Sequence, residues 1–124
     1  MNTTNALRIS AIMGFLAVAL GAFGAHGLKA MLESNGQLAT WEKAAHYHLV
    51  HAVALVALSL CGKLRVWPWR LWLAGTVIFS GSLYVLALTN VKWLGAITPI
   101  GGTLLLAGWL ALAFSRMPEA QERT

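Results

Sequence analysis

Three histidines, His46, His48 and His51, occur within six residues near the middle of the chain. They open an apolar stretch that ends near Leu60, and a fourth histidine, His26, closes the apolar stretch before it. Imidazole can transfer a proton, bind a metal or make a buried hydrogen bond. Titratable side chains that enter a membrane are commonly functional. These histidines are therefore the first candidates for chemistry.

Helical phase separates the three neighbouring histidines. With Glu42 set at zero and about 100° added per residue, His46 falls at about 40°, Tyr47 at about 140°, His51 at about 180° and His48 at about 240°. One helix cannot aim all three rings at one atom. Glu42 and His46 are expected to share one face, and Tyr47 and His51 the opposite face.

The side chains that would complete a metal or catalytic site are scarce. The chain has four acidic residues, which are Glu33, Glu42, Glu119 and Glu122, and one cysteine, Cys61. Zinc sites are built from several such ligands, and no Ser-His-acid or paired-carboxylate arrangement is visible. The sequence predicts no metal, no cofactor and no catalytic residue, so an enzyme is the least expected class.

The expected depth in the membrane gives His51 and His26 different partners. If the second apolar helix enters hydrocarbon near Ala44, His51 lies roughly 10 Å below the surface at about 1.5 Å per residue. We expect its ring to be neutral and satisfied by a carbonyl or by one of the hydroxyls of Ser80, Ser82, Tyr84 and Thr98. His26 is expected near the surface, where it would meet Glu42, His46 or the first-loop backbone and pin the first helix to the second.

The elements that must position these residues are membrane helices. The chain has 124 residues, of which 58% are hydrophobic and only 10% charged, with a mean hydropathy of +0.67; soluble domains carry about 25% charged residues. Four stretches are long enough to cross a bilayer, at about residues 7–28, 41–60, 71–88 and 94–114. The first exceeds a signal-peptide core and is expected to be retained. The predicted fold is all-α: one domain, residues 1–124, forming an integral membrane four-helix bundle of up-down-up-down order.

Basic residues and tryptophans set the expected orientation. Positive charge stays on the cytoplasmic side, and one side collects six basic residues: Arg8, Lys63, Arg65, Arg70, Arg116 and Arg123. The other side collects three: Lys29, Lys43 and Lys92. Both termini are therefore predicted in the cytoplasm. The net charge of +5 is explained by these helix ends, so no nucleic-acid partner is expected. All six tryptophans are expected at the two membrane interfaces.

The first loop is the longest. Leu28, Met31 and Leu32 predict a short amphipathic helix in the interface, ended by the Ser34-Asn-Gly36 run. Thr40 is expected to cap the second helix, with Glu42 in its first turn.

Small residues predict how the helices pack, because close backbone approach drives association in lipid. The first helix repeats Gly14, Ala17, Gly21 and Gly24, and the others carry small pairs spaced by seven, as at Gly101 and Gly108. Pro99 falls in the first turns of the fourth helix and Pro118 after its end.

Several runs together resemble a known family. These are Gly21-Ala-Phe-Gly-Ala-His-Gly27, Trp41-Glu-Lys-Ala, Tyr47, His51-Ala-Val-Ala-Leu55, and Pro99-Ile-Gly-Gly-Thr103 with Gly108-Trp109. The chain resembles the uncharacterised YgdD/YwdK-like family of small bacterial inner-membrane proteins, and distantly the eukaryotic transmembrane protein 256 group. The resemblance implies a four-helix protein of the bacterial inner membrane whose molecular function has not been established. It implies that Gly102 and Trp109 belong to the family motif. It also implies that His46 and His48 are not part of that motif and are particular to this chain.

Four functions then compete. The first is a structural or accessory protein, as a homo-oligomer or as a component of a membrane complex, whose surroundings are the lipid bilayer. The second is a carrier or channel for a small solute or proton that uses His26 and His51. A haem, quinone or metal-binding protein comes third, and a membrane enzyme last. The candidate functional or structural polar positions are His26, Glu42, Tyr47 and His51, and the candidate packing positions are Gly14, Gly21, Gly24, Gly101, Gly102 and Gly108.

Overall fold

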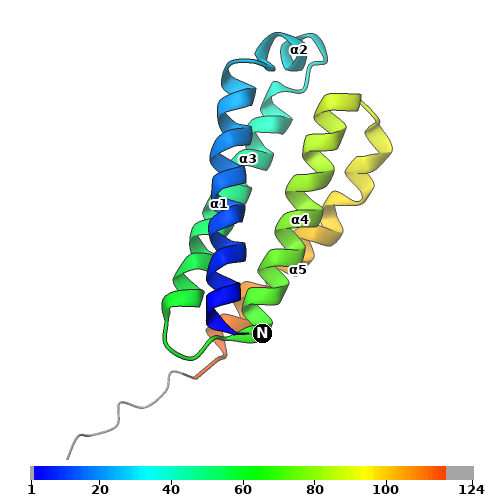
Figure 1. The fold of residues 1–124 in the computed structure, drawn as a ribbon. Helices are drawn as coiled ribbons and strands as arrows, with labels where there is room; N and C mark the ends of the chain where they lie inside the picture. The colour runs from blue at the N-terminus through cyan, green and yellow to red at the C-terminus, as the bar shows by residue number, and fades with distance from the viewer. Residues whose placement is uncertain (1, 117–124) are drawn as a thin grey trace, which may run out of the picture.

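The computed structural model describes residues 2–116, and all regular structure in that range is helical (Figure 1). The elements are α1 (Thr3–Ala25), α2 (Lys29–Ser34), α3 (Leu38–Leu60), α4 (Val66–Thr89), the 3₁₀ helix η1 (Lys92–Ala96) and α5 (Thr98–Ala113). The predictions for Pro118, Glu119, Glu122 and Arg123 lie outside the described residues.

The first helix begins earlier than hydropathy suggests because the polar residues before it form a cap. The Asn2 side chain accepts a hydrogen bond from the Asn5 backbone N–H at 2.8 Å, which satisfies one of the free donors of the first turn. At the other end His26 leaves the helical conformation. α1 therefore covers 3–25 where 7–28 was expected.

The short helix predicted in the first loop is present as α2. Leu32 is fully buried, whereas Met31 is 40% exposed, so only part of the expected apolar face is covered by the protein. The chain reverses at Gly36, whose φ of +69° suits glycine. The predicted stop at this glycine is confirmed.

The expected start of α3 is wrong by about a turn. Gln37, not Thr40, precedes the helix, and Thr40 lies inside it with its hydroxyl donating to Gln37 Oε1 at 2.7 Å. The Gln37 N–H bonds back to the Leu32 carbonyl at 2.8 Å, so the chain is already turned for a helix at Leu38. Glu42 consequently falls beyond the first turn, where the helix dipole acts weakly.

The last two long helices also differ from their predicted bounds. α4 begins at Val66 and includes Pro68, which costs no hydrogen bond in a first turn. It ends at Thr89, and the next residue, Asn90, adopts a left-handed conformation with φ 58°. The predicted helix at 94–114 is divided into η1 and α5, and Pro99 occupies the first turn of α5.

In the described part of the chain, three helical segments are long and apolar enough to cross a membrane: Thr3–Ala25, Val66–Thr89 and Lys92–Ala113. The fourth predicted span, α3, is 23 residues long, but its three histidines together with Glu42 and Lys43 reduce its hydropathy. The all-helical class is therefore confirmed with three apolar spans, and the polar helix is the one that carries the candidate chemistry.

The helices pack mainly against their neighbours in the chain. α1 packs on α3, α3 on α4, and α4 on α5, with η1 against both α4 and α5 (Figure 1). α3 and α4 are thus the inner pair, and α1 and α5 the outer helices. One buried cluster joins Trp69 and Trp72 to Leu55 and Leu105, and a second joins Trp41 to Leu32 and Tyr84.

The six tryptophans, all expected at the membrane interfaces, differ in how far the protein buries them. Trp41, Trp69 and Trp72 are at most 2% exposed and form the core, whereas Trp67 and Trp93 are more than 60% exposed near helix ends. Glycines on the facing helices leave space for two of the buried rings. A Cβ built on Gly24 would collide with Trp41, and a Cβ on Gly108 would collide with Trp72.

Candidate functional site: the buried histidines of α3

The three histidines of α3 do not form one site, as helical phase predicts. His46 is exposed, whereas His48 and His51 are each only 4% exposed. His48 faces Tyr84 on α4, and His51 faces Trp109 on α5. The two buried rings therefore join α3 to two different helices.

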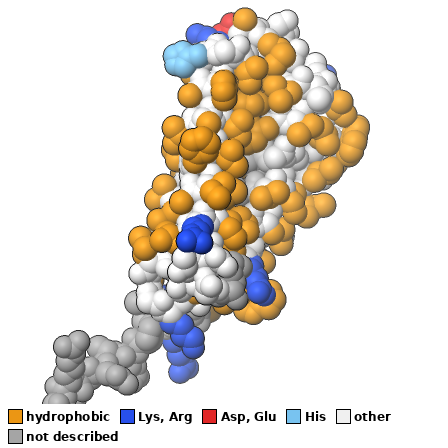
Figure 2. All heavy atoms as spheres, in the orientation of Figure 1, with side chains coloured by type: hydrophobic (Ala, Val, Ile, Leu, Met, Phe, Trp, Pro, Cys, Tyr) orange, Lys and Arg blue, Asp and Glu red, His pale blue; other side chains and the backbone are white. Residues whose placement is uncertain are grey.

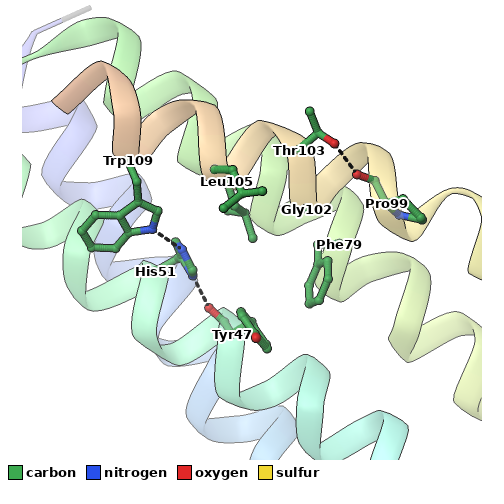
Figure 3. Close-up of a pocket in the computed structure, with 9 residues that line it drawn as sticks. Tyr47, His51, Phe79, Pro99, Gly102, Thr103, Leu105 and Trp109 are labelled. Carbon is green, nitrogen blue, oxygen red and sulfur yellow. Dashed lines mark hydrogen bonds between the residues drawn. The ribbon is translucent and has the colours of Figure 1, made fainter. Parts of the chain in front are cut away.

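Both nitrogens of His51 are occupied by protein groups (Figure 3). Nδ1 lies 2.8 Å from the Tyr47 carbonyl, and the Trp109 indole N–H donates to Nε2 at 3.1 Å. A carbonyl only accepts and an indole N–H only donates, so the proton must sit on Nδ1 and the ring is the neutral tautomer. The expected buried contact is confirmed, with a carbonyl on one side. Trp109 is a partner that the sequence did not single out for this role.

The His51 ring also closes one side of a mostly apolar cavity. The cavity measures about 390 Å³ and lies among α3, α4 and α5. Its lining includes Tyr47, Phe79, Pro99, Thr103 and Trp109 (Figure 3). The Thr103 hydroxyl donates to the Pro99 carbonyl of its own helix at 2.8 Å. Tyr47 contributes its ring, which lies 4.9 Å from Phe79 and 6.3 Å from His51 between centroids.

His48, which was not among the candidate positions expected from the sequence, is also buried and hydrogen-bonded. Its Nδ1 lies 2.9 Å from the Tyr84 hydroxyl, and the Met13 backbone on α1 is a further polar neighbour. Within residues 2–116, Nε2 has no partner in hydrogen-bond geometry, and neither has the Thr76 hydroxyl. Both residues line a pocket of about 180 Å³ among α1, α3 and α4. The only sequence signal was the three-residue spacing from His51, which puts both rings on neighbouring faces.

The role expected for His26 is filled by another residue. The His26 side chain is exposed, and the described part of the chain offers it no hydrogen bond, ion pair or ring contact, so the predicted pin is wrong. Instead the Trp41 indole N–H donates to the Leu20 carbonyl at 2.8 Å and the ring rests on Gly24. His26 follows the last turn of α1 with its side chain exposed, whereas Trp41 reaches across from the first turn of α3.

Glu42 and His46 share a face, as predicted. Both line a groove of about 530 Å³ between α1 and α3, together with Gly21, Gly24 and Ala45. Both are exposed, which indicates a rim and not a buried acid-base pair.

A second polar cluster, not anticipated from the sequence, ties three helices together near the opposite end. Ser10 on α1 and Ser59 on α3 have hydroxyl oxygens 3.2 Å apart, and the Trp69 indole N–H of α4 donates to Ser10 at 3.1 Å. All three residues are buried. Hydroxyls in buried helix faces stabilise interhelical contacts when paired in this way.

Most of the predicted packing glycines do lie at close helix contacts. A Cβ on Gly101 would collide with the Phe79 backbone, and one on Gly102 would lie 3.6 Å from the Phe79 ring. A Cβ on Gly21 would lie 3.9 Å from Ala45. Gly14 is different, because a Cβ there would meet nothing within 4 Å.

The described residues contain no group of three His, Cys, Asp or Glu side chains that could hold a metal. Cys61 is exposed at the end of α3. With both nitrogens of His51 engaged, the arrangement favours helix association over ligation.

Long apolar helices with a small number of buried, paired polar groups define a helical membrane protein. The family described as "Protein of unknown function (DUF423)" matches residues 20–102. UPF0382 membrane protein SH2409 of Staphylococcus haemolyticus is 45% identical, over 86% of this chain and 90% of its own. UPF0382 membrane protein YwdK of Bacillus subtilis is 41% identical over 84% and 89%, and a UPF0382 membrane protein of Haemophilus influenzae 42% over 87% and 90%.

The chain belongs to this DUF423 (UPF0382) membrane protein family, which confirms the YwdK-like resemblance. No solved structure matches it. The matched segment includes His48 and His51 but ends before Trp109.

Proposed function

We propose that the protein spans the bacterial inner membrane four times, in up-down-up-down order, with both termini in the cytoplasm. Three spans are apolar, and α3, at 23 residues or roughly 34 Å, is long enough to be the fourth. Its buried histidines face other helices instead of lipid. Hydrophobic side chains cover the length between two charged ends (Figure 2), as a bilayer requires.

The charge distribution supports the orientation. Among residues 2–116, five basic residues lie near the start of α1, between α3 and α4, near the start of α4 or after α5: Arg8, Lys63, Arg65, Arg70 and Arg116. Near the other ends of the long helices lie Lys29 at the start of α2, Lys43 in the second turn of α3 and Lys92 at the start of η1. Cysteines introduced singly at Ser115 and Asn35, in a Cys61→Ser background, test this by labelling intact cells with a membrane-impermeant maleimide. We expect labelling at Asn35 alone.

Within the membrane the protein acts as a structural or accessory component. The observation that carries this proposal is His51, whose two nitrogens are both filled by the Tyr47 carbonyl and the Trp109 indole. A ring held in this way joins helices and offers no open position to a passing solute. The serine and tryptophan cluster of Ser10, Ser59 and Trp69 serves the same purpose at the other end.

The outer face of α1 supports assembly with another chain. Gly14 is the glycine of α1 at which a Cβ would meet no described atom within 4 Å, and Phe15 and Val18 beside it are exposed. Small residues on lipid-facing helices allow a second helix to approach closely. We therefore place the contact with a second copy or a partner protein on this face.

The size of the native particle in mild detergent tests assembly. We expect a mass above the 13.3 kDa of one chain after subtraction of detergent. Gly14→Leu should return the particle toward one chain, whereas Ala74→Leu, at an exposed small residue of α4, should not. A single-chain mass for the unaltered protein at all concentrations would contradict an assembly role.

A carrier or channel for a small solute or proton remains the second proposal, and it now depends on His48. His48 Nε2 and the Thr76 hydroxyl line one pocket, and neither has a partner in hydrogen-bond geometry among residues 2–116. Proteoliposomes with an imposed pH gradient and an internal pH dye test proton movement. His48→Gln should reduce the proton flux at least tenfold, and His46→Gln, at an exposed position, should not. If the unaltered protein gives the same flux as empty liposomes, the proposal that it moves protons is wrong.

A further inference from the structure

A groove runs between the ends of α3 and α5 that lie nearest the α3–α4 connection. It exists because α3 and α5 each pack on α4 and leave a space of about 540 Å³ between them. The Trp72 and Trp109 rings, 4.4 Å apart between centroids, close one end, and Leu58 and Leu112 form the sides. Almost all of this lining is apolar.

One cation stands in the lining of this groove. Arg65, just before α4, lines it together with Ser115. The Arg65 guanidinium lies 3.5 Å from the Arg116 carbonyl, and a guanidinium has five donors in a planar fork that suits a phosphate. Lys63 and Arg116 are close in sequence to this point. The two described acids, Glu33 and Glu42, belong to α2 and the start of α3, at the opposite end of the helices.

We propose that this groove binds an anionic glycerophospholipid, with an acyl chain between α3 and α5 and the phosphate on Arg65. The apolar walls match the chain, and the arginine at the proposed cytoplasmic surface matches the charge of the headgroup. Basic pockets between membrane helices on that side recognise such headgroups. The proposal rests on the membrane arrangement above, and it is independent of assembly and of transport.

The position of Trp109 gives the site a structural consequence. The same indole borders this groove and donates to His51 in the neighbouring cavity. A chain lying against Trp109 would hold its ring in the rotamer that makes this hydrogen bond. Bound lipid should therefore stabilise the contact between α3 and α5.

The test is lipid binding by native mass spectrometry together with thermal unfolding in mild detergent. Dioleoylphosphatidylglycerol should bind and raise the unfolding temperature, and dioleoylphosphatidylcholine should bind at least tenfold more weakly. Arg65→Gln should weaken phosphatidylglycerol binding about tenfold, which corresponds to loss of one charge-assisted hydrogen bond. The matched control is Arg70→Gln, because Arg70 lies over the Trp67 ring, 5.8 Å from its centroid, and does not line the groove.

Two further probes distinguish the contribution of the apolar groove to lipid binding from that of the Arg65 charge. Ala57→Phe places a ring in the groove at an exposed position, so it should reduce phosphatidylglycerol binding even if Arg65→Gln fails to fold. Glycerol 3-phosphate, which lacks acyl chains, should not raise the unfolding temperature. Equal binding of the two lipids, equal losses in the two arginine variants, or full binding by Ala57→Phe would each overturn the proposal. None of these results depends on the particle mass that tests assembly.

Discussion

Replacing Trp109 by phenylalanine isolates the hydrogen bond that holds His51. Phenylalanine keeps an aromatic ring in the same place, against the rings of Trp72 and His51, but it removes the N–H that donates to Nε2 at 3.1 Å. His51 is 4% exposed, so water does not readily replace the lost donor. The change therefore leaves a buried acceptor without a partner.

The expected loss can be bracketed from two directions. Leaving a buried acceptor unpaired costs about 1 to 3 kcal/mol in soluble proteins, whereas polar contacts between membrane helices average about 0.6 kcal/mol and reach about 1.7. Trp109 is 45% exposed, so the smaller ring adds little through lost burial. We expect Trp109→Phe to reduce the free energy of unfolding by about 1 to 2 kcal/mol.

A double-mutant cycle measures the hydrogen bond itself. His51→Phe, Trp109→Phe and the double variant are unfolded reversibly by SDS in mixed micelles, with helicity as the signal. The coupling free energy should be about 0.6 to 1.7 kcal/mol, and Trp67→Phe, at a ring 68% exposed, should change stability by less than about 0.5 kcal/mol. A coupling energy of zero would refute the assignment of His51 as the link between α3 and α5.

Three pairs of substitutions follow from the geometry, each measured by the same unfolding assay. Gly24→Ala should cost about 1 to 3 kcal/mol because its Cβ meets the buried Trp41 ring, while Gly14→Ala, with open space, should cost nothing; equal effects would show that the predicted close contact is absent. Trp41→Phe should cost about 1 kcal/mol through loss of the bond to the Leu20 carbonyl, whereas His26→Ala should stay within about 0.5 kcal/mol, and the reverse order would restore His26 as the pin. Asn90→Gly should be tolerated and Asn90→Val should cost about 1 kcal/mol or more, because φ is 58° there; an unaffected valine variant would contradict the left-handed turn.

Hydropathy predicted that the long helices exist but misplaced their ends. The ends depend on local polar contacts, such as the Asn2 cap and the turn that brings Gln37 back to Leu32. Neither contact changes the hydropathy averaged over about twenty residues, which is the length of a membrane span. The class of fold was therefore available from composition, and the boundaries were not.

The candidate site was predictable only in the relative directions of side chains that belong to the same helix. Phase along α3 correctly separated His46 from His51, because both belong to one rigid element. The partners of the buried rings lie 36 and 58 residues further along the chain, at Tyr84 and Trp109, and no spacing rule reaches that far. The burial of Trp41 and Trp72 could not be predicted for the same reason, since the glycines that make room for their rings, Gly24 and Gly108, lie on other helices.

The order of helix contacts has a consequence for biogenesis. Each long helix packs on the next one to be synthesised, so the hairpin of α1 and α3 can pair before α4 and α5 leave the ribosome. At that stage His48 and His51 lack Tyr84 and Trp109, and in the proposed membrane arrangement they would be exposed to lipid, which is unfavourable for an imidazole. Arrival of the second hairpin relieves this exposure. In the proposed membrane arrangement, the same two histidines would make the half-inserted protein short-lived and drive the closing step of its assembly.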